Sequence, residues 1–116
     1  MENFNEVVQG FLSFLDGPLQ KLGYMSPKGD FIKVGNTFCS YREYEGSKKK
    51  IVVEMTMEGN KKGGTRLIAD VRDEGGEGNI YFWEEVEAEQ EGLLEQVRAL
   101  TKTLISKTEE TVCSTA

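Results

Sequence analysis

The chain has 116 residues, a formal net charge of -6, two cysteines and no histidine. Its length suits one domain that buries roughly 65% of its unfolded surface. Without histidine the chain lacks Ser-His and Cys-His catalytic pairs and most zinc or iron sites, so we expect no enzyme, no metal and no cofactor.

The charge and hydropathy also restrict the partners and the compartment. An acidic chain disfavours nucleic acid, because phosphate binding needs a concentrated basic surface. No apolar run reaches the roughly 20 residues of a membrane span, and the start MENFNEVVQGF lacks the features of a signal peptide. We therefore expect a cytoplasmic protein that binds neither nucleic acid nor membranes, with Cys39 and Cys113 as reduced thiols.

Residues 3–22 predict a helix, because apolar side chains recur at spacings of three and four. Gly23 suits the left-handed position beyond its end. Pro18 conflicts with the pattern, since it cannot donate a helical hydrogen bond. Either the helix kinks at the proline, or it stops at Leu15 and a short second turn begins at Pro18. The apolar stripe comprises Phe4, Val7, Val8, Phe11, Phe14, Leu15, Leu19 and Leu22.

From about residue 30 the apolar period changes to two, which is typical of strands. The dipeptide Gly35-Asn36 separates two strand-like runs and predicts a two-residue hairpin turn. In that register Ile32 faces Cys39. The thiol then shares a face with aliphatic side chains, so we expect it to be packed and unreactive.

Two further strands are predicted at 51–58 and 65–71, where odd-numbered positions are apolar. If these strands pair, odd residues must oppose odd residues, because a slip of one would turn Asp70 toward the core. The loop between them then contains an odd number of residues. With both terminal helices on the odd-numbered side, the opposite face is either ordinary exposed surface or a surface for a partner or a homodimer. That face would carry Val52, Glu54, Ile68 and Asp70.

The segment 72–85, RDEGGEGNIYFWEE, partly matches a twelve-residue calcium loop. Asp73 and Glu84 stand at the first and last ligand positions. Gly75, however, supplies no side-chain oxygen at the third, and a strand-like segment precedes the loop where a helix is required. We therefore predict a turn between strands, followed by a short strand over 79–83.

A final helix is predicted from about 85 to 107. Its start is crowded with carboxylates and its end carries Lys102 and Lys107, which matches the helix dipole. Residues 109–116 are polar, and we expect a disordered tail beyond a single domain at 1–108. The expected apolar stripe comprises Val86, Leu93, Leu94, Val97, Leu100, Leu104 and Ile105.

The order of helix, four or five antiparallel strands and long helix predicts an α+β fold, with a meander sheet covered on one face by both helices. In element order and charge the chain is similar to small acidic α+β domains among secretion chaperones and toxin-immunity proteins. That similarity of architecture implies binding to another protein.

We accordingly expect a non-catalytic protein-binding module of inhibitor, immunity, chaperone or adaptor type. The acidic run after residue 83 lies beside aromatic side chains, which favours electrostatic capture of a basic partner with Tyr81 and Trp83 as anchors. Solvation of a helix start would explain the same carboxylates. The expected partner-binding residues are Tyr81, Trp83, Glu84, Glu85, Glu87, Glu89 and Glu91.

The alternative function is binding of a small apolar ligand. Methionine and phenylalanine side chains between a curved sheet and its helices can line a pocket, although they more often form plain core. That pocket would be lined by Phe11, Phe14, Met55 and Met57.

Overall fold

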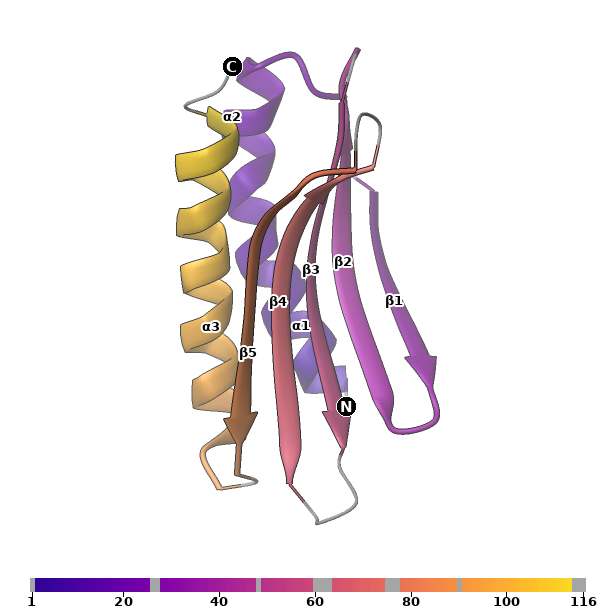
Figure 1. Ribbon diagram of the computed structural model, residues 1–116, viewed down its shortest axis with the longest axis vertical. Coiled ribbons are helices and arrows are strands. Elements are labelled where there is room, and N and C mark those ends of the chain that lie inside the picture. The colour runs from indigo at the N-terminus through magenta and orange to yellow at the C-terminus, as the bar shows by residue number, and fades with distance from the viewer. Residues whose placement is uncertain are drawn as a thin grey trace.

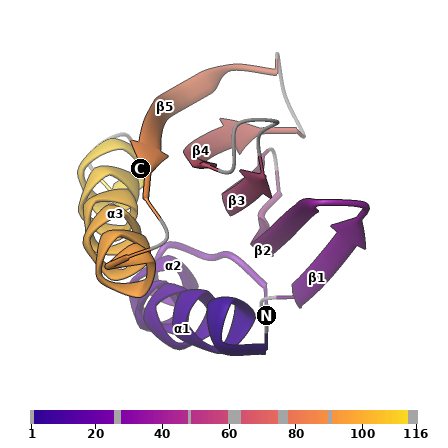
Figure 2. The ribbon, with the colours of Figure 1, turned by 90° about the horizontal axis from the view of Figure 1, so that it is seen from below.

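The computed structural model describes residues 2–25, 28–47, 49–59, 64–74, 78–89 and 91–113. Five antiparallel strands form a meander in the order β1-β2-β3-β4-β5, and α1 and α3 lie side by side against one face of it (Figures 1 and 2). The predicted α+β architecture is confirmed. The elements are α1 (Glu2–Leu12), the 3-10 turn η1 (Ser13–Leu15), α2 (Asp16–Lys21), β1 (Lys28–Val34), β2 (Thr37–Glu45), β3 (Lys50–Gly59), β4 (Thr65–Asp73), β5 (Ile80–Ala88), α3 (Leu93–Thr108) and the π-helical turn η2 (Glu109–Cys113).

The helical backbone changes type just before the proline: α1 ends at Leu12, η1 follows, and α2 begins at Asp16, two residues before the start at Pro18 that the second alternative gave. Pro18 lies in the first turn of α2, where its missing N–H removes no helical hydrogen bond. Phe14 is 67% exposed and Leu22 is also exposed. The predicted stripe is wrong at these two positions, because the 3-10 turn at η1 changes the rotation per residue. The buried side chains of this region are Phe4, Val8, Leu12, Leu15 and Leu19.

The strand registers follow the predicted parity. Ile32 is opposite Cys39 in the first hairpin, and Met55 is opposite Ala69 between β3 and β4. The β3–β4 ladder ends at the pair Gly59 and Thr65, which leaves five residues, an odd number, in the connection. Apolar side chains of both strands therefore face α1 and α3, and the core lies between the sheet and these helices.

The C-terminal helix begins later than predicted. Its predicted start at residue 85 is wrong, because β5 continues to Ala88 and α3 begins at Leu93, after Gly92 with φ of 79°. Val86 is opposite Leu67 on the covered face, while Glu85 is opposite Ile68 on the other face. The alternation of acidic and apolar residues in this segment has the period of a strand.

The end of the chain also differs from the predicted tail. Residues 109–113 continue α3 as the turn η2, in which Val112 is 5% exposed. Residues 114–116 of the expected tail lie outside the described residues. In the described part of the chain, no helix has the length and apolar character needed to cross a membrane.

A polar network joins α1 and α2 to β2 on the covered face. Arg42 donates to both oxygens of Asp16, from Nε at 2.9 Å and from Nη2 at 2.7 Å. The Tyr44 hydroxyl donates to Asp16 at 2.6 Å, and Gln9 donates to Ser40 at 2.9 Å while it accepts from Arg42 at 2.8 Å. We call these five residues the inner network.

Candidate functional site: the outer face of the sheet

The outer face of the sheet, opposite the helices, presents its side chains in rows that cross the strands. Cross-strand pairing defines two adjacent rows near the middle of the face. One, the acidic row, contains three carboxyl groups and two aromatic rings. The other, the neutral row, carries no charge over its four residues on β1 to β4, and Glu85 stands at the next position on β5. The acidic row is Asp30, Tyr41, Glu54, Asp70 and Trp83, and the neutral row is Ile32, Cys39, Thr56 and Ile68.

Asp70 occupies the centre of this surface and is 2% exposed, although no helix covers it. Arg72 bridges Asp70 and Glu54 through Nη1, which lies 2.9 Å from Asp70 Oδ2 and also donates to Glu54 Oε1. The Nε of the same guanidinium donates to Glu74 Oε1 at 2.9 Å. The Cys39 thiol donates to Glu54 Oε2 at 3.3 Å. We call these five residues the outer network.

The electrostatics of the outer network leave negative charge in excess. Burial, the hydrogen bond to Glu54 and the charge of Glu54 raise the pKa of Asp70 to about 7, against the lowering effect of Arg72. Burial and the neighbouring Glu54 also raise the pKa of Cys39 to about 12, despite a hydrogen bond to Thr56 that lowers it. This thiol therefore stays protonated at neutral pH, which agrees with the prediction that it is packed and unreactive.

A second arginine on the outer face is also surrounded by acid. Arg66 forms ion pairs with Glu58 and, at 3.6 Å, with Glu85. Its pKa is raised first by the hydrogen bond to Glu58, and the charges of Glu58, Glu85 and Glu87 contribute further. Within the described residues, the nearby carboxylates thus outnumber each of these two guanidinium groups.

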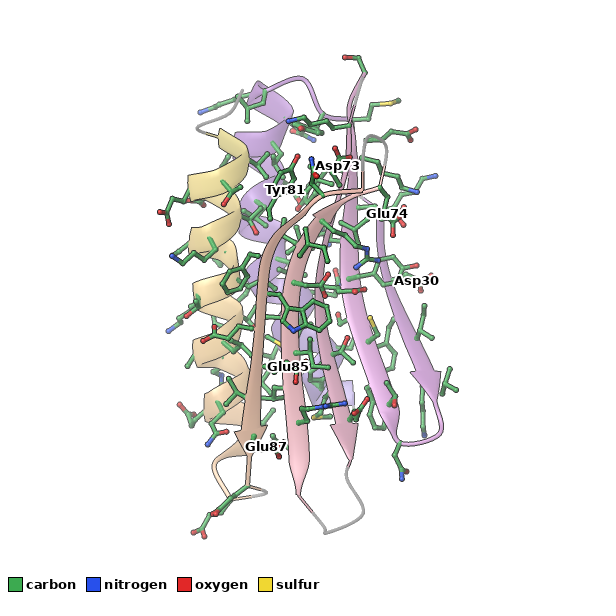
Figure 3. The ribbon with its side chains drawn as sticks, in the orientation of Figure 1. Asp30, Asp73, Glu74, Tyr81, Glu85 and Glu87 are labelled. Atoms are coloured by element: carbon green, nitrogen blue, oxygen red, sulfur yellow. The ribbon has the colours of Figure 1, made fainter. Side chains whose placement is uncertain are left out.

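Trp83, the sole tryptophan of the chain, lies at the β5 end of the acidic row. Its side chain is 53% exposed, and the indole Nε1 donates to Glu85 Oε1 at 3.2 Å. Figure 3 shows Glu85 and Glu87 one after the other along β5. A half-exposed aromatic ring beside carboxylates that outnumber their arginines is therefore available to a partner.

The structure places only part of the predicted partner-binding set on this surface. Trp83, Glu85 and Glu87 lie on the outer face of β5. Glu84 is opposite Ala69 on the covered face, where it alternates with them. The expectation of one surface was therefore wrong for Glu84, because it rested on a helix and the segment is a strand.

Tyr81 also leaves the predicted set. It lies at the irregularity where Val71 pairs with Phe82 and Arg72 with Ile80, and it packs against the core. Lys49 Nζ lies 5.8 Å from the centre of its ring. Figure 3 shows Tyr81 near the opposite end of β5 from Glu87.

Glu89 and Glu91 are exposed in the connection between β5 and α3. They lie beyond the last residue of β5 and do not form one helical surface with Glu84 and Glu85. Residue 90 between them lies outside the described residues.

Several members of the candidate site were not identified from the sequence, among them Asp30, Tyr41, Arg72 and Glu74. The rule that odd-numbered residues of β3 oppose odd-numbered residues of β4 placed Glu54 and Asp70 on the same face. It did not show that the two residues are directly opposite each other. The loop length sets that register, and sequence periodicity does not contain it.

The four residues predicted to line a ligand pocket differ in burial and line neither of two hollows in the described part of the chain. Met55 and Met57 are buried in the core, whereas Phe11 is half-buried and Phe14 is exposed. The rings of Phe11 and Phe14 contact each other, with centres 6.5 Å apart. The described residues line a hollow of about 240 Å³ at Met25, Lys28, Glu43 and Glu45, and another at Pro18, Ser106, Glu109 and Glu110, and none of the four predicted residues lines either.

The calcium-loop alternative for residues 72–85 is also incompatible with the strands. Asp73 accepts a hydrogen bond from the Lys50 backbone N–H at 3.2 Å, and Glu84 is opposite Ala69, four residues along β4. This separation corresponds to about 13 Å, too far for two ligands of one ion. Residues 75–77 lie outside the described residues, and no group of histidine, cysteine or acidic side chains suited to a metal occurs in the part described.

Comparison with known proteins gives no relative. No protein-family model, no curated protein and no solved structure matches this chain.

Proposed function

We propose that this protein is a non-catalytic binding module of inhibitor, immunity, chaperone or adaptor type, and that the outer face of its sheet captures a basic segment of another protein. The observation that carries the proposal is the half-exposed Trp83 beside carboxylates that outnumber their arginines. Charge of one sign around an aromatic anchor is the arrangement that steers and then holds an oppositely charged partner.

The two rows supply different parts of the interaction. The acidic row attracts lysine or arginine, and Tyr41 and Trp83 at two of its positions offer ring faces for cation–π contact. The neutral row beside it offers Ile32, which is 47% exposed, and the partly exposed Ile68. Apolar groups of the partner can lose water there without burying an unpaired charge.

Charge also argues against a second copy of this chain as the occupant. A symmetric dimer through the outer face would bring Glu85, Glu87 and the outer network of each copy near those of the other, and like charges across an interface oppose association. The proposed partner is therefore a different protein. A reducing cytoplasm is the compartment that suits the free thiol of Cys39.

The proposal is tested by capture from native lysate with four forms of the protein as bait: wild type, Trp83→Ala, Glu85→Lys/Glu87→Lys, and the control Glu109→Lys/Glu110→Lys. The control makes the same change of charge on exposed residues of η2, away from the outer face. We expect a basic protein that wild type and control both retain and that both outer-face variants lose.

Two outcomes contradict the proposal. One is a captured protein that the outer-face variants bind as well as wild type does. The other is a captured protein that only the η2 variant loses. Far-UV circular dichroism of each bait shows that the variants are folded.

A further inference from the structure

The outer network contains two carboxyl groups at directly paired positions. Glu54 on β3 is the register partner of Asp70 on β4, and one nitrogen of Arg72 donates to both. The side chain of Asp70 is 4% exposed and that of Glu54 is 19% exposed. Two carboxylates in contact and shielded from water repel each other, so one of them favours the protonated form.

The groups around this pair do not remove that repulsion. Arg72 is the cation that contacts Asp70, and it also serves Glu54 and Glu74. From β2 the thiol of Cys39 donates to Glu54, and the phenol of Tyr41 is directly opposite Glu54, with Asp30 beyond it on β1. From β5 the indole of Trp83 is opposite Asp70, with Glu85 next along that strand face. Within the described residues, three carboxyl groups therefore share a single guanidinium.

We propose that the Glu54–Asp70 pair holds one proton in the free protein and releases it to water when a cationic side chain of the partner docks over the acidic row. This inference rests on the proposed function, because it describes how that same surface responds to its basic partner. The partner's cationic side chain replaces the proton, because it neutralises the carboxylate charge that Arg72 leaves uncompensated. The O–H bond of the pair breaks, the proton passes to solvent, and both carboxylates then face a cation.

A proton exchanged near neutral pH is unusual in this chain. Histidine is the side chain that ordinarily titrates there, and the sequence contains none. Burial and Glu54 bring the pKa of Asp70 to about 7, while the pKa of Cys39 is raised away from this range. Capture of the partner should accordingly strengthen as pH rises through neutrality.

The proton is tested first in the free protein, without any partner. The chain has four aspartates, Asp16, Asp30, Asp70 and Asp73, so ¹³C labelling of their carboxyl carbons gives a short NMR spectrum to follow against pH. We expect one resonance, absent in Asp70→Asn, to titrate near pH 7. In Glu54→Gln its midpoint should fall by one unit or more, and in the control Glu58→Gln it should not move. Asp70 titrating below about pH 5, near the ordinary range of a carboxyl group, would overturn the inference.

The coupling is tested second, with an oligo-arginine peptide at low ionic strength as the basic probe. If binding requires the ionised pair, affinity should rise about tenfold between about pH 6 and about pH 8, and calorimetry in two buffers should show release of about half a proton at pH 7. Asp70→Asn should remove both effects.

The outcomes separate the two claims. A peptide that binds at the outer face with no proton release overturns the inference and leaves the proposed function standing. A peptide that binds elsewhere, or not at all, contradicts both. Retention of the pH dependence in Asp70→Asn assigns the proton to another group and also overturns the inference.

Discussion

The inner and outer networks lie on opposite faces of the same sheet, and each is built around one arginine. In the inner network Arg42 meets one carboxylate, Asp16, with two nitrogens on two oxygens. In the outer network Arg72 meets Glu54, Asp70 and Glu74. The inner arrangement matches donors to acceptors and holds α1 and α2 on β2. The outer arrangement leaves negative charge unmatched on an open surface, which is a reason to assign it to binding rather than to stability.

The two central aspartates show the difference in their protonation. Burial raises the pKa of Asp16, but the hydrogen bonds from Arg42 and Tyr44 outweigh it, so the net pKa is lowered. Burial also raises the pKa of Asp70, and there Glu54 adds to the increase. The same residue type is therefore held as an anion on one face and shifted toward the neutral acid on the other.

The largest expected effect comes from removing each arginine in turn. Arg42→Met leaves Asp16 as a partly buried charge without its ion pair, and should lower the free energy of unfolding by about 3 kcal/mol. The matched change Arg72→Met should cost only about 1 kcal/mol at pH 6, because Asp70 can keep its proton. Urea unfolding followed by circular dichroism measures both. If Arg42→Met and Arg72→Met lowered the free energy of unfolding equally, the proposed difference between the inner and outer networks would be contradicted.

The next effect concerns pH. The pKa of Asp70 is raised in the folded state above its ordinary value of 3.8, so its contribution to stability is fully present below about pH 4 and is lost as pH rises through about 7. The free energy of unfolding should fall by roughly 2 kcal/mol between about pH 5 and pH 8. Asp70→Asn should remove this loss of stability. Unfolding curves of wild type and Asp70→Asn at several pH values within this range measure the difference.

Asp16 gives the opposite dependence and sharpens the same comparison. The pKa of Asp16 is lowered in the folded state. The ionised carboxylate therefore adds to the free energy of unfolding above the ordinary pKa, and this contribution is lost as pH falls through the lowered pKa. Asp16→Asn should therefore destabilise the protein at neutral pH and lose less on acidification than wild type. Acid unfolding that is unchanged by this substitution would contradict the assignment.

The smallest effect on stability is expected for Trp83→Ala. About half of the indole is exposed, so the free energy of unfolding should fall by less than about 1 kcal/mol. Binding of the basic partner should nevertheless be lost. A large loss of stability would mean that Trp83 supports the fold rather than a partner.

The sequence predicted more of the covered face than of the outer one, for a physical reason. Period-two alternation located the strands, and the parity of their pairing followed from the need to keep Asp70 out of the core. The acidic segment after Trp83 was misassigned because carboxylates suit both a helix start and the exposed face of an edge strand. The pairing of Glu54 with Asp70 depends on the register between β3 and β4, which the length of their connecting loop sets and which sequence periodicity does not encode.

The exposed Phe14 shows a second limit. Its spacing from Phe11 fits an ideal helix, but the turn at η1 has fewer residues per turn and rotates Phe14 out of the core. The proline three residues after the end of η1 signalled an interruption, yet it did not indicate that the helical rotation changes at Ser13.

The most direct test of the central claim is NMR mapping of the ¹⁵N-labelled protein with the oligo-arginine peptide at low ionic strength. The proposed function predicts that the largest amide shifts fall on β2 to β5 around Tyr41, Asp70 and Trp83, with little change in α1 and α3. Shifts concentrated on the helices, or spread evenly over the carboxylates of the molecule, would show that the outer face is not the binding surface.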